Sequence, residues 1–440
     1  MSAVDTTSGD TSPGHRHRRV PRPGLGRDFQ RLWAGQGVSA LGTAATSVAL
    51  PLVAVATLDA SAFQVALLST ASWLPWLLIS LPAGAWVDRL RRRPLMVACQ
   101  LLSVGLLVSV PVAAWLDLLT IAHLLTVALG AGTAKVFFQT AYQVYLPTLV
   151  PAVDLPAGNA RLQGTEAAAR VGGPGLAGLV AGGIGAVNAL LVEAASLAVA
   201  AICLLGIRSA EPRPAVRQRD ASLRQEVSEG IRFVARDPYL RVLAVFGAAS
   251  NLGLVGYQSI LVVFLVREVG VRPALVGGLM AVMSLGGVVG ALLATTLARR
   301  IGTARAMLAC ELGAAPFGLL IPLTGPGPRL ALAAVGGMVI GAGVVAGNVI
   351  KESFRQAYTP HHLLGRVLSS MQLVNLGAIP LGTLAAGALA GALGLRTAVW
   401  TATGWLALTG LILLIGPLRR HRDLPAQPAP DRGAQSPVMV

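Results

Sequence analysis

Long apolar runs separated by short polar segments divide the sequence, and this alternation constrains the fold more than any other feature. A helix needs about 20 apolar residues to cross the hydrocarbon core of a bilayer. On that measure the sequence predicts an all-α membrane protein with twelve transmembrane helices. The predicted spans are residues 33–57, 62–85, 94–116, 119–146, 163–185, 187–207, 239–265, 273–298, 304–324, 329–350, 366–392 and 396–418.

The composition agrees with a protein that crosses a membrane many times. The 440 residues are 54% hydrophobic and only 12% charged, whereas soluble domains carry about 25% charged residues. The formal charge of +16 is spread over the polar segments between the apolar runs, so it does not predict binding to nucleic acid. The three cysteines all lie in apolar runs and give no disulfide framework. We expect a multi-pass protein of the plasma membrane, typical of a bacterial inner membrane, in contact with the lipid bilayer.

The basic residues predict the orientation of the chain. Lys and Arg near the ends of spans favour the cytoplasmic side. With both termini in the cytoplasm, and residues within about three positions of a span end assigned to the adjoining segment, 29 of the 35 Lys and Arg residues lie on that side, four lie outside, and Lys135 and Arg170 fall within spans. The opposite orientation would invert this asymmetry, so the sequence predicts cytoplasmic N and C termini.

The longest internal polar stretch, residues 208–238, divides the predicted spans six and six. Its apolar positions Val227, Ile231 and Val234 predict an amphipathic helix along the membrane face. The expected organisation is a disordered cytoplasmic tail at 1–30, a six-helix bundle at 31–207, a cytoplasmic central loop at 208–238, a second six-helix bundle at 239–418 and a disordered cytoplasmic tail at 419–440.

The two halves share a weak internal repeat. Met96-Val97-Ala98-Cys99 begins the third span, and Met307-Leu308-Ala309-Cys310 begins the ninth. Gly130-Ala131-Gly132 in the fourth span matches Gly341-Ala342-Gly343 in the tenth. Parallel repeats of this kind describe two bundles that face each other, with the substrate path between them.

Three motifs resemble those of a known family. The turn between the second and third spans reads Gly84-x-x-x-Asp88-Arg89-x-x-Arg92-Arg93 and is similar to the loop between helices 2 and 3 of the major facilitator superfamily. The segment Arg27-Asp28-Phe29-x-Arg31-Leu32-Trp33-x-x-x-Gly37 resembles the branch that contains macrolide exporters and the enterobactin exporter. Gly172-Gly173-Pro174-x-x-Ala177-Gly178 is similar to the fifth-helix motif of proton-driven antiporters, although Ala169 and Ala177 replace two of its glycines.

The resemblance implies a gate at the turn between the second and third spans. Asp88 would face the start of the eleventh span, where a helix N-terminus and Arg366 attract it, and this contact would form in one conformation and break in the other. For the arginines, the alternative role is to fix topology. The residues assigned to gating are Gly84, Asp88, Arg89, Arg92, Arg93 and Arg366.

The fifth-span motif has two interpretations. Gly173, Pro174 and Gly178 either permit tight helix packing around a proline kink or, as the resemblance implies, control leak and the change between conformations.

Charged and polar side chains within the spans are candidates for the cavity, because charge inside a membrane is costly and is usually retained for function. Glu193 is the candidate proton carrier; its alternative role is a bond to a neighbouring helix. Lys135 neutralises Glu193 or Glu166, or attracts an anionic substrate. Glu166 and Arg170 lie one helical turn apart and form a structural pair. The full set of cavity candidates is Lys135, Glu166, Arg170, Glu193, Asn251 and Gln258.

The sequence has no nucleophile–base pair, metal-ligand cluster or phosphate-binding loop, so we predict no enzymatic activity, no metal and no cofactor. The predicted function is secondary-active export of small amphipathic or hydrophobic molecules by proton antiport with alternating access, in a monomer. One alternative is an exporter dedicated to a siderophore or another secondary metabolite, with Lys135 and Arg170 facing the anion. The other is a non-transporting membrane sensor or scaffold.

Overall fold

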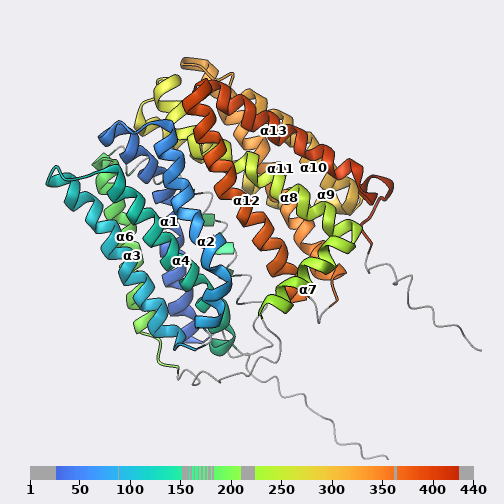
Figure 1. The fold of residues 1–440 in the computed structure, drawn as a ribbon, viewed down its shortest axis with the longest axis horizontal. Helices are drawn as coiled ribbons and strands as arrows, with labels where there is room; N and C mark the ends of the chain where they lie inside the picture. Colours follow the sequence, from blue (N-terminus) through green and yellow to red (C-terminus); the bar gives the residue numbers. More distant parts are fainter. Residues whose placement is uncertain are drawn as a thin grey trace, which may run out of the picture.

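The computed structural model describes residues 26–87, 89–150, 183–209, 223–360 and 364–425, together with isolated residues between 158 and 180. All the regular structure in this part of the chain is helical (Figure 1). The first half contains α1 (Arg27–Leu58), α2 (Ala62–Val87), α3 (Arg92–Trp115), α4 (Ile121–Leu149) and α6 (Ala186–Leu205). The predicted fifth span, 163–185, is described only in part.

The second half follows the short helix α7 (Leu223–Arg236). Its long helices are α8 (Pro238–Val263), α9 (Pro273–Ile301), α10 (Thr303–Ala314), α11 (Leu330–Tyr358), α12 (Leu364–Leu393) and α13 (Leu395–Ile415). A π-helix, η1 (Phe264–Glu268), extends α8, and the 3₁₀ helices are η2 (Ala315–Leu320), η3 (Gly327–Arg329) and η4 (Pro417–Arg420).

Nine helices in the described part of the chain are long and apolar enough to cross a membrane. Helices suit this environment because each satisfies its own backbone hydrogen bonds, for which the bilayer core offers no water. The prediction of an all-α protein with many apolar spans is therefore confirmed, whereas the total of twelve spans and the cytoplasmic location of both termini stay predictions.

The predicted ninth span, 304–324, is not one regular helix. The α-helical part ends at Ala314, and the chain continues as the 3₁₀ helix η2. Pro316 lies in η2 and has no backbone N–H to donate to an α-helical bond, which explains why the α-helix does not continue through this position.

The two halves form two groups of helices. Figure 1 shows α1–α6 in blue to green on one side and α8–α13 in yellow to red on the other. Between the groups, α2 and α12 pack against each other. The helix α7 packs on α8 and α12, and so belongs with the second half. Its residue Val234 is buried there, whereas Ile231 is 43% exposed.

The two halves share a hydrophobic core at one end of the molecule only. We call this end the Asp59 end, after the residue that follows α1, and the opposite one the Asp28 end. At the Asp59 end a single cluster joins residues of the first half, such as Val53 and Val65, with residues of the second, such as Ile260. At the Asp28 end each half has a separate cluster. The halves are thus in close contact at the Asp59 end.

Candidate functional site

The contact between α2 and α12 includes a buried hydrogen bond between the halves. The hydroxyl oxygens of Thr70 and Thr383 are 2.7 Å apart, and the two residues are 5% and 0% exposed. One turn further along α12, a Cβ on Gly387 would collide with the Cβ of Ala66. The absence of a side chain at Gly387 therefore permits the close approach of the two helices.

An ion pair joins the halves at the surface of the Asp59 end. Arg267 of η1 donates to the carboxylate of Asp59, with side-chain exposures of 30% and 97%. This pair, the threonine bond and the shared core all lie on the same side of the molecule. Any motion that separates the halves at the Asp59 end must break all three.

A buried carboxylate lies inside the first half. Glu193 of α6 is only 5% exposed. Thr43 of α1 hydrogen-bonds to its carboxylate, and Lys135 of α4 interacts with it electrostatically. The second carboxylate oxygen, Oε2, has no hydrogen-bond partner among the described residues. The structure therefore brings together Lys135 and Glu193, which the sequence predicts as a candidate pair.

The other cavity candidates are more dispersed. Asn251 of α8 is half-buried and donates to the carbonyl oxygen of Asn375 on α12, at 3.3 Å. Gln258 is exposed and hydrogen-bonds to the adjacent Tyr257. Glu166 is half-buried and interacts electrostatically with Tyr142. Arg170, its expected partner, lies outside the described residues.

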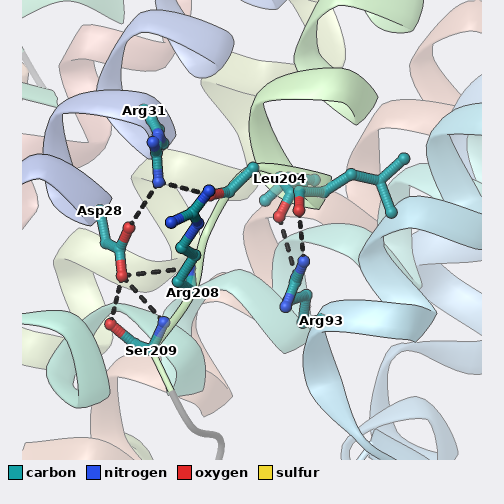
Figure 2. Close-up of polar contacts among 8 residues, drawn as sticks. Asp28, Arg31, Arg93, Leu204, Arg208 and Ser209 are labelled. Carbon is teal, nitrogen blue, oxygen red and sulfur yellow. Dashed lines mark hydrogen bonds and ion pairs between the residues drawn. The ribbon is translucent and has the colours of Figure 1, made fainter.

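The predicted gating turn is only partly described. Gly84 lies in the last turn of α2 and Arg366 in the first turn of α12, but Asp88 and the side chain of Arg366 lie outside the described residues. Arg89 is exposed and Arg92 is half-buried. Arg93 donates from Nε to the carbonyl oxygen of Leu204 at 2.9 Å and from Nη2 to that of Leu205 (Figure 2).

These two bonds place Arg93 at the C-terminus of α6, within its own half. The last carbonyl groups of a helix have no intrahelical donor and carry partial negative charge, so a guanidinium satisfies both needs. In the fifth-span motif, Gly173 is helical and buried, whereas Pro174 and Gly178 lie outside the described residues.

A second buried glutamate, absent from the predicted site, has a close partner. The Lys351 Nζ of α11 is 2.6 Å from the Glu311 carboxylate of α10, and the two side chains are 13% and 5% exposed. The ammonium group also lies 4.7 Å from the centroid of the Phe246 ring. Beside the pair, a pocket lined by Ser250, Thr409 and neighbouring apolar residues has room for about one water molecule.

Glu311 falls within the predicted ninth span, 304–324, but the sequence did not reveal its partner. The predicted tenth span ended at residue 350, which left Lys351 among the cytoplasmic charges. Forty positions separate the two residues, so no helical spacing signals the pair. Among the described residues, no three His, Cys, Asp or Glu side chains are grouped as a metal site requires.

Comparison with known proteins gives a consistent result. Residues 24–436 match the model of a major facilitator family described as transmembrane secretion effector. The multidrug efflux pump Tap of Mycolicibacterium fortuitum is 29% identical over 411 residues, which cover 91% of this chain and 97% of that pump.

Solved structures share the fold at much lower identity. A mutant of the nucleoside transporter NupG superposes with a TM-score of 0.73 at 11% identity, over 88% of this chain and 99% of that one. A bacterial homologue of the iron transporter ferroportin, 16% identical, gives 0.71 in its inward-facing state, over 88% of this chain and 98% of that one. Its outward-facing state gives 0.55, over 90% and 100%.

Proposed function

Because the chain belongs to the transmembrane secretion effector family of the major facilitator superfamily, and is thus a multi-pass membrane transporter, we propose that it exports small amphipathic or hydrophobic molecules in exchange for protons. Similarity to a multidrug efflux pump over nearly the whole of both chains supports drug efflux as the activity. The predominantly apolar spans favour substrates that are themselves partly apolar.

The observation that carries the proposal is the unequal contact between the halves. They share a core, a buried hydrogen bond and an ion pair at the Asp59 end, but have separate cores at the Asp28 end. With the Asp28 end in the cytoplasm, as the basic residues predict, this is a conformation closed to the outside. The higher TM-score to the inward-facing state of the ferroportin homologue, 0.71 against 0.55, supports the same assignment.

Alternating access then requires a second conformation in which the Asp59 end opens. The Asp59–Arg267 pair and the Thr70–Thr383 bond would act as the outer gate of the first conformation. Two exposed charges contribute about 0–1 kcal/mol, and a buried hydrogen bond about 1 kcal/mol. Contacts of this size hold a gate closed without making its opening prohibitive.

Glu193 is the proposed proton carrier. A charged carboxylate in a membrane interior is costly unless a cation or hydrogen bonds compensate for it. Lys135 and Thr43 provide part of that compensation, and Oε2 stays available to a proton. Proton binding at Glu193 would weaken its attraction for Lys135, which links the protonation state to the relative position of α4 and α6.

A second candidate function rests on Lys135, which is exposed in the middle of α4 although its neighbours Ala134 and Val136 are buried. An exposed cation at that depth would attract an anionic substrate. In that case the protein would be an exporter dedicated to one siderophore or similar acidic metabolite.

The test is accumulation of fluorescent dyes and macrolides in an efflux-deficient bacterium that expresses this chain, with and without a protonophore. We expect cells that express the chain to accumulate less of these compounds, and we expect the protonophore to abolish this difference. The Glu193→Gln variant should not lower accumulation. The matched control is Glu229→Gln, which changes an exposed glutamate on α7. Protonophore-sensitive export that persists in Glu193→Gln would remove Glu193 from the mechanism. No effect of the wild-type chain on any compound, with the protein present in the membrane, would favour the dedicated exporter.

A further inference from the structure

The N-terminal motif of α1, which the proposed function leaves unexplained, forms a polar cluster with the end of α6 (Figure 2). The Asp28 carboxylate accepts hydrogen bonds from the backbone N–H of Arg208 at 3.2 Å and from the backbone N–H and hydroxyl of Ser209 at 2.8 and 2.5 Å. Its other oxygen accepts from Arg31 at 3.0 Å. Arg31 also donates to the carbonyl oxygen of Gly206.

The other residues of the motif fix α1 on its remaining sides. Phe29 and Leu32 are 0% and 1% exposed in the core of the first half. The Trp33 Nε1 donates to the Thr165 hydroxyl at 2.8 Å, and a Cβ on Gly37 would lie 2.9 Å from a methyl carbon of the same threonine. The motif therefore fixes the start of α1 in three ways: by polar bonds to residues 206–209, by packing in the core of the first half and by contacts with Thr165.

From this cluster, α1 and α6 run antiparallel along a line of small residues that leads to Glu193. A Cβ on Gly35 would lie 3.0 Å from the Cβ of Cys203. Further along, a Cβ on Gly42 would collide with Ser196 and lie 3.3 Å from the Cα of Glu193. Thr43, the next residue of α1, hydrogen-bonds to the Glu193 carboxylate. Asp28 and Thr43 are separated by about 22 Å of helix at 1.5 Å per residue.

Small residues let two helices approach closely, and along this line Ser196 fills the space beside Gly42. Directional bonds at the two ends of the contact add to this packing in determining how far one helix is shifted along the other. At the Asp28 end these are the bonds of Asp28 and Arg31 to residues 206–209, reinforced by Arg93 on the last carbonyls of α6.

We propose that Asp28 and Arg31 form a clamp that sets the register of α1 against α6 and so positions Thr43 beside Glu193. Asp28 is a positioning residue, since it acts on Glu193 only through the helix pair. The proposal rests on the proposed function in taking Glu193 as the site that protons reach, but the register itself is measurable without transport.

The experiment uses the full-length protein in lipid nanodiscs with Cys99→Ala and Cys310→Ala, so that Cys203, which faces Gly35, is the sole thiol. We expect Asp28→Ala to raise the rate of maleimide labelling of Cys203 about tenfold, because hydrogen bonds to a charged group contribute about 1.5–3 kcal/mol. Ser209→Ala, which removes one bond, should give a smaller rise, and Asp28→Glu should restore most of the protection.

The matched control is Asp237→Asn. Asp237 is the N-cap residue of α8, where it accepts hydrogen bonds from the N–H groups of Tyr239 and Leu240 and from the Tyr358 hydroxyl. It should leave Cys203 labelling unchanged. A second readout is the pH titration of the Glu193 carboxyl band in difference infrared spectra, assigned with Glu193→Gln. Asp28→Ala should shift its midpoint, and Asp237→Asn should not.

Unchanged labelling of Cys203 in Asp28→Ala would overturn the clamp. Faster labelling with an unshifted Glu193 titration would overturn the link to Glu193. If the wild-type chain exports none of the compounds tested, the proposed function fails, whereas labelling and titration still decide this proposal.

Discussion

The buried ion pair of the second half permits a quantitative test of how this bundle is held together. Glu311 and Lys351 are 2.6 Å apart and only 5% and 13% exposed. Removing one member of such a pair costs about 3–5 kcal/mol because it leaves an uncompensated buried charge, whereas replacing both by well-packed neutral residues is close to neutral. We therefore expect a strongly non-additive double-mutant cycle with a coupling of at least about 3 kcal/mol.

The perturbations are Lys351→Met, Glu311→Gln and their combination. Lys351→Met should be the most destabilising single change, since it leaves a bare carboxylate while the thioether keeps the contact with Phe246. Glu311→Gln should cost less, because the amide oxygen still accepts from Lys351. The double variant should recover most of the stability.

The assay is the apparent melting temperature of the purified protein in nanodiscs, followed by size-exclusion fluorescence. The internal repeat offers a second double variant, Glu311→Gln with Lys351→Thr. This pair reproduces Gln100 and Thr140, the residues at the matching positions of the first half, where Gln100 is likewise 5% exposed. If the losses of stability add in both double variants, each residue stabilises the bundle through its side-chain shape and not through compensation of its partner's charge, and the reasoning is refuted.

Three further results are expected. Asp59→Asn with Arg267→Gln should change the rate of export by less than about fivefold, measured in everted vesicles, because the Asp59 side chain is 97% exposed and such pairs contribute below about 1 kcal/mol. Thr70→Val should raise the population open at the Asp59 end about fivefold, measured by spin-label distances, because it removes a buried bond of about 1 kcal/mol to Thr383. The Ser209 hydroxyl holds the pKa of Asp28 below its usual 3.8, against the opposing effect of burial and with further help from backbone N–H groups and Arg31. The stabilisation from this lowered pKa is present above pH 3.8 and is lost as the pH falls through the folded value. The protection of Cys203 from maleimide should therefore be constant from about pH 5 to 8.

The helices were largely predictable from the sequence because the membrane imposes both their length and their apolar character. The helix α2 begins at Ala62, as predicted, and α6 covers Ala186–Leu205 where 187–207 was expected. The exception is the region after α10, where apolar character continues but Pro316 changes the backbone. An apolar run identifies a span without distinguishing an α-helix from a 3₁₀ helix.

Contacts between distant residues were less accessible to sequence reasoning. The motif around Asp28 was visible as a resemblance, but its partner Ser209 is 181 positions away and neutral. The pairing of Lys135 with Glu193 could be predicted as one of a few alternatives, since the first half has few intramembrane charges. The Thr70–Thr383 bond gave no signal, because threonines are common in helices and only the packing of α2 on α12 brings these two together.

Each half thus contains a buried glutamate that a lysine attracts, and the difference between the two sites bears on which one suits the proposed exchange of protons. Glu311 forms a direct bond to a lysine that is itself nearly buried, so its charged form is compensated. Glu193 has an oxygen without a hydrogen bond from the described residues, and the lysine that acts on it is exposed. A carrier must bind and release its proton in each cycle, which requires a charged form that is only partly stabilised and a route to water. On the first count Glu193 fits the proposed carrier role better than Glu311, whose direct bond to Lys351 suits a fixed link between α10 and α11.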